Sequence, residues 1–323
     1  MRPKRILVTG AGGFAGRHLL PTLRAAFPDA ALVGARRSLA EGPVPDADET
    51  VALDLDQGAS LADAVASVRP DAVLHLAAYA DVGASFRNPL AVWRTNVLGT
   101  VGLGEAVLRA APEAPFLVAS SAEVYGLSFQ SGTPVAEDAP FAPANPYAAS
   151  KAAADLAVGE MALRGLRAVR MRAFTHTGAG QTDGFVVAAF AHQVARIEAG
   201  QQPPVLRTGA LDRWRDFLDV RDVCAAYVAA LSRADSLPPG IAMNICSGTP
   251  RRIGDILEAL LRLSGVKAEV EQEASRLRPT DVRSVQGDPA LARETLGWSP
   301  VVPWEETLAS VLADWRARVA AGE

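Results

Sequence analysis

Residues 5–16 read RILVTGAGGFAG, a run of apolar residues followed at once by closely spaced glycines. Apolar residues on consecutive positions favour a strand that is buried on both faces, as in a parallel sheet. Gly10, Gly13 and Gly16 then permit a tight turn, close approach of the backbone to a phosphate, and tight packing of helix on strand. A helix that begins at Phe14 and Ala15 would direct the free backbone N–H groups of its first turn towards a bound phosphate. The stretch therefore predicts a dinucleotide-binding turn.

The same alternation of a short apolar run and an amphipathic segment continues through the first half of the chain. The expected strands are residues 5–10, 30–36, 49–55, 71–78, 114–121 and 166–173. The expected helices are residues 14–26, 60–68, 89–111 and 146–163. Strand–helix alternation predicts right-handed βαβ units and an α/β fold of the Rossmann type, with a doubly wound parallel sheet. We expect residues 1–173 to form this domain, with returning segments at about 217–247.

The regular alternation stops after residue 173. Loops that carry glycine and arginine follow at 176–184 and 207–216, and the last third of the chain has mostly helical patterns. We expect residues 174–216 and 248–323 to form a smaller, mostly helical substrate-binding domain.

The composition is that of a soluble globular protein, with 49% hydrophobic and 21% charged residues. A net charge of -4 without any basic run argues against a nucleic-acid partner. No segment approaches the ~20 apolar residues of a membrane span, and the apolar run at the N-terminus is too short for a signal peptide. Cys224 and Cys246 are expected to be buried free thiols, so the expected location is the cytoplasm. No metal site is predicted.

The end of the second expected strand bears on the choice of nicotinamide cofactor. Residues 34–38 read GARRS, with Arg36, Arg37 and Ser38 where an acidic residue would bind the ribose hydroxyl of NAD. Two guanidinium groups and a hydroxyl suit a 2′-phosphate, which a carboxylate would repel. The sequence favours NADP(H), and NAD(H) remains an alternative.

Residues 145–151, NPYAASK, place a tyrosine and a lysine four positions apart. Asn145 is a good helix N-cap and Pro146 suits the first helical position, so Tyr147 and Lys151 share one helix face. A phenol ordinarily titrates near ~10, but an adjacent ammonium and a helix N-terminus stabilise the phenolate. The spacing therefore predicts an acid/base pair. Ser121, at the end of the fifth strand, can form a hydrogen bond with the substrate oxygen that exchanges a proton with Tyr147.

The glycine turn, the strand-end serine and the Y-x-x-x-K motif together resemble the extended short-chain dehydrogenase/reductase family, whose members act mainly on nucleotide sugars. The resemblance covers essentially the whole chain. It implies that Ser121, Tyr147 and Lys151 are catalytic, and that Tyr147 and Lys151 also contact the cofactor. Further cofactor contacts that it implies are Asp54, Leu55, Leu76, Ala77, Ala78 and Asn96. It also implies a homodimer or a dimer of dimers, built on the helices at 89–111 and 146–163.

The second half of the chain is similar to two branches of this family, the GDP-4-keto-6-deoxy-mannose reductases and the GDP-mannose 4,6-dehydratases. The similar stretches are RAFTHTGAGQ (172–181), RDFLDVRDV (215–223), MNICSG (243–248) and RLRPTDV (276–282). The similarity implies a nucleotide-sugar substrate, GDP-linked, with contacts from Ser85, Thr175, His176, Arg215 and Arg278. The two arginines would bind the diphosphate. Thr175 departs from the asparagine that is common in the family.

The resemblance implies NADPH-dependent reduction of the C4 ketone of a nucleotide-activated 4-keto-6-deoxyhexose, to GDP-rhamnose or a C4 epimer. Glu123 keeps a 4,6-dehydratase open, because a glutamate at this position of dehydratases removes a proton beside a transient ketone. Against dehydration, Ala122 stands where one type of dehydratase has an aspartate. A nucleotide-sugar 4-epimerase is a further alternative. A non-catalytic NADP-binding redox sensor is a distant one, since such relatives usually lose the tyrosine or the lysine.

Overall fold

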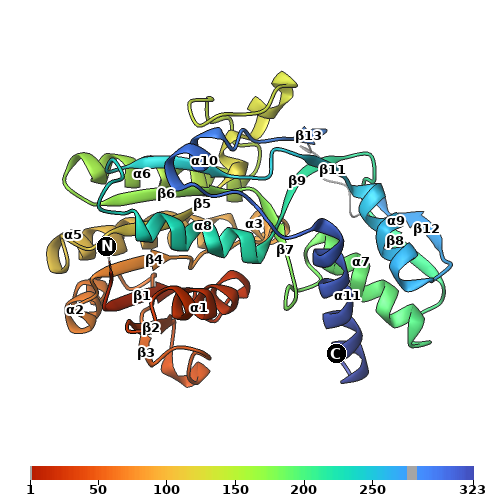
Figure 1. The fold of residues 1–323 in the computed structure, drawn as a ribbon, viewed down its shortest axis with the longest axis horizontal. Helices are drawn as coiled ribbons and strands as arrows, with labels where there is room; N and C mark the ends of the chain where they lie inside the picture. Colours follow the sequence, from red (N-terminus) through yellow and green to blue (C-terminus); the bar gives the residue numbers. More distant parts are fainter. Residues whose placement is uncertain (1, 275–281) are drawn as a thin grey trace.

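The computed structural model describes residues 2–274 and 282–323. A larger lobe is built on a seven-stranded parallel sheet, and a smaller, mostly helical lobe lies at one end of it (Figure 1). The order of the strands across the sheet is β3-β2-β1-β4-β5-β6-β10. These strands are β1 (Arg5–Thr9), β2 (Ala31–Arg36), β3 (Glu49–Ala52), β4 (Ala72–His75), β5 (Phe116–Ser121), β6 (Ala168–Ala173) and β10 (Ile241–Ile245). The predicted doubly wound α/β fold is confirmed.

The sheet changes its winding direction beside β1, which pairs with β2 on one side and β4 on the other. A crevice opens beyond the carboxyl ends of parallel strands at such a point, and ligands bind there. The central strands are buried along their length, as their unbroken apolar sequences predict; all four residues of β4 are buried. The fold thereby places the glycine turn after β1 and the serines at the end of β5 along the same edge.

Helices cover both faces of the sheet. One face carries α1 (Phe14–Ala26), α8 (Val220–Ser232) and α10 (Ala290–Leu296). The other face carries α2 (Gly58–Val68), α5 (Thr100–Ala110) and α6 (Pro146–Leu163). The helices predicted at 14–26 and 146–163 are present with those bounds. α10 packs on the large sheet although residues 248–323 were expected in the second domain, and the division into domains stays a prediction.

The segment that was predicted as one helix at 89–111 has a more complex structure. It consists of α4 (Pro89–Trp93), the π-helical η2 (Arg94–Gly99) and α5, and a short helix α3 (Val82–Arg87) precedes it. The first turn of α4 is capped by the side chain of Asn88, which accepts from the backbone N–H of Ala91 at 3.3 Å. The wider turn of η2 contains Asn96, and it points this side chain into the protein.

The smaller lobe packs three helices around a core of its own: α7 (Val186–Glu198), α9 (Ile253–Ser264) and α11 (Trp304–Ala320). A small sheet joins this lobe to the larger one, and it was not predicted. Its strands are β7 (Thr175–Thr177), β9 (Trp214–Asp219), β11 (Pro250–Arg252) and β13 (Ser284–Val285). A two-stranded sheet of β8 (Val205–Thr208) and β12 (Glu269–Gln272) and the 3₁₀ segments η1 (Leu39–Glu41) and η3 (Ala122–Ser131) complete the described elements. Among the described helices, none combines the length and apolar character that crossing a membrane requires.

Candidate active site

The glycine turn after β1 has a backbone that only glycine allows. Gly10 has a φ of 69°, and a Cβ there would lie 2.7 Å from the backbone nitrogen of Ala77. A Cβ on Gly16 would collide with the carbonyl oxygen of Gly10, which accepts a 2.9 Å hydrogen bond from Gly13 N–H. The turn therefore brings the start of α1 directly onto the end of β1, which is the geometry of a phosphate-binding turn.

A cavity of about 390 Å³ lies against this turn. Eight of the predicted cofactor residues line it: Gly10, Gly13, Arg36, Arg37, Asp54, Leu55, Ala77 and Ala78. Thr9, Gly12, Glu41, Asp56, Tyr79 and Thr95 also line it and were not predicted. A cavity that is lined by a glycine turn and by two arginines fits a dinucleotide.

Carboxylates lie beside the two arginines of this cavity. A guanidinium nitrogen of Arg36 lies 3.5 Å from Glu41 Oε2, and its Nε–H is buried without an acceptor in the part of the chain that the structure describes. Arg37 contacts Asp54 at 3.4 Å and Asp56 at 3.2 Å. The backbone N–H of Ser38 donates to Glu41 Oε1 at 3.1 Å. A 2′-phosphate bound beside these arginines would therefore compete with the Glu41 carboxylate for the N–H donors of Arg36 and Ser38.

Other predicted contact residues line neither cavity, and they include Asn96, Ser85 and Leu76 as well as Phe14, Ala15, Gly16, Ser38, Ser121, Tyr147 and Lys151. Asn96 is buried, and it bonds to both backbone groups of Tyr79, at 2.8 and 3.1 Å, and to Ser150 Oγ at 2.9 Å. Ser85 is buried and donates to the carbonyl of Val82 at 2.6 Å. Leu76 donates its backbone N–H to the Thr9 carbonyl at 3.2 Å. Their ligand contacts stay predictions, and Asn96 holds the segment after β4 against α6.

The predicted acid/base pair, Tyr147 and Lys151, lies at the start of α6, which begins as predicted. Asn145 Oδ1 accepts from the backbone N–H of Ala148 at 2.8 Å, and Pro146 occupies the first turn. Lys151 is buried, and its Nζ donates to the carbonyl of Ala119 on β5 at 2.7 Å. The side chain of Tyr147 meets the hydroxyl of Ser121 at the end of β5. The structure thus brings Ser121, Tyr147 and Lys151 together.

Burial tunes both members of this pair. It raises the pKa of Tyr147 to about 12, although the hydrogen bond with Ser121 lowers it. It lowers the pKa of Lys151 to about 8, although the nearby charge of Asp155 raises it. At neutral pH the phenol therefore holds a proton that it can donate, beside a lysine that is mostly ammonium.

A second cavity, of about 330 Å³, extends from Glu123 into the smaller lobe. Glu123, Thr175, His176 and Arg215, all predicted site residues, line it. Glu123 also accepts a hydrogen bond from Asn145 Nδ2 at 3.1 Å, so this cavity reaches the N-cap residue of α6. A wall of mixed aromatic, hydroxyl and arginine groups suits a sugar joined to a diphosphate.

Arg207 and Arg213 line the same cavity but were not predicted. The signal for them was the arginine-bearing loop at 207–216, from which only Arg215 was selected. Phe14 was predicted as a cofactor residue, yet its ring stacks on His176, with centroids 6.2 Å apart and an interplanar angle of 11°. Arg278, a predicted diphosphate contact, lies outside the described residues. Within residues 2–274 and 282–323, no group of three or more His, Cys, Asp or Glu residues could hold a metal ion.

Known proteins resemble this chain over nearly its whole length. GDP-6-deoxy-D-mannose reductase of Pseudomonas aeruginosa is 37% identical, with 98% of each chain covered. UDP-glucose 4-epimerase of Azospirillum brasilense is 31% identical, covering 92% of this chain and 87% of the relative. The solved structure of RMD from Pseudomonas aeruginosa complexed with NADPH has a TM-score of 0.84 at 36% identity, with 98% of each chain covered.

A family profile agrees with these relatives. The profile of the NAD dependent epimerase/dehydratase family matches residues 6–246, which include the glycine turn, the acid/base pair and the strand-end serine. Since the match takes in most of the chain, and the 37% identical relative spans nearly all of it, the chain belongs to this family, the extended short-chain dehydrogenases/reductases that its sequence predicted.

Proposed function

We propose that this protein reduces the C4 ketone of a GDP-linked 4-keto-6-deoxyhexose, using NADPH. The observation that carries the proposal is the contact of Tyr147 with Ser121 at the carboxyl end of β5, with Lys151 one turn later on α6 bound to the same strand. The 37% identity to an enzyme named GDP-6-deoxy-D-mannose reductase, across 98% of both chains, supports the reaction and the GDP-linked sugar.

The residues of the chain divide the chemistry between them. A bound reduced nicotinamide supplies hydride, the difficult part of the reaction. Tyr147 donates its phenolic proton to the oxygen that becomes an alkoxide at C4 of the sugar. Ser121 donates a hydrogen bond to the same oxygen and holds it in place. The Lys151 ammonium stabilises the phenolate that remains on Tyr147.

The two arginines of the first cavity support NADPH as the cofactor. Arg36 and Arg37 both line this cavity, and a guanidinium binds phosphate through paired N–H groups. A relative with a TM-score of 0.84 was solved in complex with NADPH. Asp54 and Asp56 lie beside Arg37, so NADH remains the alternative that direct binding measurements separate.

The second cavity is the proposed site of the nucleotide sugar. Arg207, Arg213 and Arg215 line it together, and they provide positive charge for a diphosphate. Thr175 and His176 line the same cavity near Glu123, where a sugar can approach the start of α6. This assignment adds Arg207 and Arg213 to the predicted Arg215, while the other predicted arginine, Arg278, lies outside the described residues.

A 4,6-dehydratase is the second candidate, because Glu123 lines the second cavity and has the carboxylate that dehydration needs as a base. Its carboxylate accepts from Asn145, which gives it a second use as a partner of the helix cap. Ala122 next to it has no acidic group. A 4-epimerase is a third candidate, supported by the 31% identical UDP-glucose 4-epimerase.

One pair of reactions separates these candidates. The protein is incubated with GDP-mannose alone, and separately with a GDP-4-keto-6-deoxyhexose plus NADPH. Loss of the reduced-nicotinamide absorbance in the second reaction alone supports the proposed reductase. A 4-keto product in the first reaction identifies a dehydratase, and interconversion of 4-epimers without net NADPH loss identifies an epimerase. Absence of any turnover and of NADPH binding contradicts the proposal.

A homodimer is the proposed assembly, formed by the outer face of η2 and α6. Leu98, Leu156 and Leu163 are 66%, 60% and 89% exposed, and they lie on η2 and α6, the helices expected at such an interface. Light scattering at several concentrations should give twice the chain mass of 33.8 kDa. Leu156→Glu should reduce that mass to one chain, and a dimer that survives this change contradicts the proposed face.

The proposed location is the cytoplasm. Both cysteines, Cys224 and Cys246, are buried free thiols, the state expected in a reducing compartment. Fractionation of cells that produce the protein tests this location directly.

A further inference from the structure

The last three residues of β5 each contact the same face of α6. The carbonyl of Ala119 accepts from Lys151 Nζ at 2.7 Å, and the hydroxyl of Ser121 contacts the phenol of Tyr147. Between them, Ser120 Oγ donates to Asp155 Oδ2 at 2.6 Å. Tyr147, Lys151 and Asp155 are spaced four residues apart, so they form one stripe along the helix. The proposed chemistry uses the first two residues of this stripe but not Asp155.

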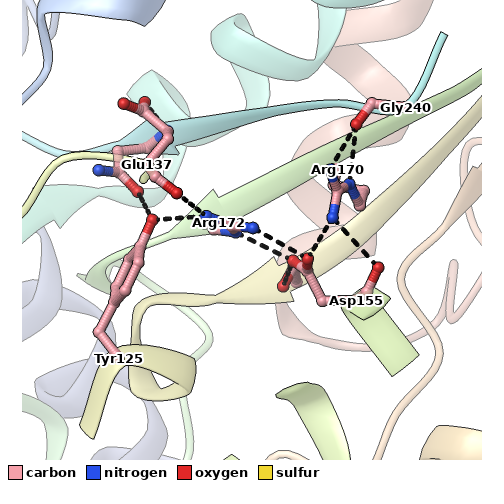
Figure 2. A network of polar contacts seen from close by, with 8 residues as sticks. Tyr125, Glu137, Asp155, Arg170, Arg172 and Gly240 are labelled. Atoms are coloured by element: carbon pink, nitrogen blue, oxygen red, sulfur yellow. Dashed lines mark hydrogen bonds and ion pairs between the residues drawn. The ribbon is translucent and has the colours of Figure 1, made fainter. Parts of the chain in front are cut away.

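Asp155 is buried, and two arginines of the neighbouring strand β6 hold its carboxylate from the other side (Figure 2). Arg172 Nε donates to Oδ2 at 3.1 Å and its Nη2 donates to Oδ1 at 3.0 Å. Arg170 Nη1 donates to Oδ1 at 2.8 Å. With Ser120 as a fourth donor, both carboxylate oxygens have fixed partners, and the side chain cannot turn without breaking several charged hydrogen bonds.

Arg172 connects this carboxylate to the segment that follows Ser121 (Figure 2). Its Nη1 donates to Tyr125 Oη and to the Glu137 carbonyl, both at 2.8 Å. Tyr125, four residues after Ser121, in turn donates to Asn244 Oδ1 at 2.8 Å. The network therefore fixes both the strand that ends in Ser121 and the chain that leaves it.

We propose that Asp155 is a positioning residue of the acid/base site, whose carboxylate sets the register of α6 on β5 so that Lys151 meets Ala119 and Tyr147 meets Ser121. This inference rests on the proposed function for its kinetic consequences, but its structural consequence for Lys151 does not. The carboxylate of Asp155 is enclosed by Ser120, Arg170 and Arg172, and it acts through Ser120 and the helix that it shares with Tyr147.

The position of Asp155 also has an electrostatic consequence. Asp155 on α6 and His75 on β4 interact electrostatically with Lys151, Tyr147 precedes it by one turn of α6, and Arg170 and Arg172 on β6 face Asp155. His75 is buried and its pKa is lowered to about 3 by burial, so it is neutral. Asp155 therefore supplies the negative charge that opposes the effect of burial on Lys151. Without it, the arginine charges of β6 are left uncompensated near the lysine.

The titration of Lys151 can be measured directly, because the sequence contains only three lysines, Lys4, Lys151 and Lys267. Lysine labelled with ¹³C at Cε gives a separate NMR signal for each, and a Lys151→Arg sample assigns the buried one. We expect the Lys151 signal of the wild type to titrate with a pKa of about 8. In D155N the midpoint should move to lower pH by about one pH unit, the effect of losing a close opposite charge.

Two further variants separate positioning from general stability. D155E keeps the charge and should restore the titration midpoint of Lys151. D222N changes another buried aspartate, which accepts from the backbone N–H groups of Val301 and Val302 away from this site, and it should lower the melting temperature without moving the Lys151 midpoint. A Lys151 midpoint that is the same in D155N and in the wild type overturns the electrostatic part of the inference.

S120A tests the positioning itself, because it removes one hydrogen bond and keeps all charges. We expect kcat for the keto sugar to fall about three- to tenfold, the value of one such bond, with KM for NADPH unchanged. D155N should lower kcat about a hundredfold, as misplacement of a reacting group does. Wild-type kcat in folded S120A and D155N overturns the inference. If the wild type itself shows no turnover, the proposed function fails, and the lysine titration still decides the role of Asp155.

Discussion

Phe14, the first residue of the helix after the glycine turn, stacks on His176, which lines the second cavity. The two ring planes differ by 11°. Nearby, His18 Nε2 donates to the Ala179 carbonyl at 2.8 Å. His176 itself donates from Nδ1 to the Phe174 carbonyl at 2.9 Å, and burial lowers its pKa. The glycine turn that lines the proposed cofactor cavity is therefore followed at once by a residue that packs on the wall of the proposed sugar cavity.

This stacking predicts a specific kinetic effect of Phe14→Leu. Loss of an aromatic pair costs about 0.5–1.5 kcal/mol, so KM for the nucleotide sugar should rise by up to about tenfold. The value of kcat and the Kd of NADPH should change much less, because the glycine turn keeps its backbone. Steady-state kinetics and equilibrium binding measure the three quantities. Phe27→Leu, at the other end of α1, is the matched control; equal sugar KM values in the two variants contradict the prediction.

Tyr147→Phe should abolish most of the turnover while leaving the fold intact. The phenol is the proposed proton donor, and loss of such a group lowers kcat by about 10²- to 10⁴-fold. Phenylalanine fills the same space beside Ser121, so NADPH should bind with nearly the wild-type Kd. Absorbance of the reduced nicotinamide follows turnover, and cofactor fluorescence follows binding. Wild-type turnover in the variant rejects Tyr147 as the acid.

Arg36→Ala should weaken NADPH and leave NADH nearly unaffected. A hydrogen bond to a charged group contributes about 1.5–3 kcal/mol, so the Kd of NADPH should rise about ten- to a hundredfold. NADH has no phosphate at this position and serves as the internal control. An equal rise in Kd for NADPH and NADH would show that Arg36 supports the structure of the cavity and does not bind the 2′-phosphate.

Glu41→Gln should have the opposite effect on cofactor binding and strengthen the binding of NADPH. Glu41 lies 3.5 Å from Arg36 and accepts from Ser38 N–H, so its charge opposes a second anion at the same donors. An exposed charge pair is worth up to about 1 kcal/mol, and NADPH should therefore bind about two- to fivefold more tightly. NADH binding should not change. Glu49→Gln, which affects a pair with Arg5 elsewhere, is the matched control.

The parts of this site that the sequence predicted are those with local signals. Asn145 and Pro146 mark the start of α6, so Tyr147 and Lys151 could be placed on one face in advance. The glycines after β1 are required by the backbone itself, since Gly10 has a positive φ. Helix caps and glycine turns depend on residues that are neighbours in the sequence, so they can be predicted without knowledge of the tertiary structure.

The parts that the sequence did not predict depend on distant residues. Asp155 looks like one polar residue on an alanine-rich helix until β6 brings Arg172 against it. Arg207 and Arg213 became site residues only because β8 and β9 lie on the wall of one cavity. The π-helical turn of η2 has no period that distinguishes it from an α-helix, and only the bonds of Asn96 to Tyr79 and Ser150 show its use.

His75 predicts how the stability of the fold depends on pH. It lies between two threonines: Nδ1 is 2.7 Å from Thr9 Oγ1, and Nε2 is 3.0 Å from Thr100 Oγ1. Thr100 already donates its hydroxyl proton to the Asn96 carbonyl at 2.7 Å, so it accepts from Nε2–H, and Nδ1 accepts from Thr9. The neutral ring satisfies every partner. Burial, together with the charge of Lys151, lowers the His75 pKa to about 3.

The sign of the effect follows from which state binds the proton. Between pH 6.5 and 3 the unfolded chain protonates this histidine and the folded chain does not, so the free energy of unfolding falls as the pH falls. The loss is at most about 1.4 kcal/mol for each pH unit. In His75→Gln, whose amide can still donate and accept, urea unfolding should lose part of its pH dependence between pH 7 and 4. The wild type, measured in the same series of pH values, is the reference. Equal slopes in the wild type and in His75→Gln would show that His75 is not the group that senses acid.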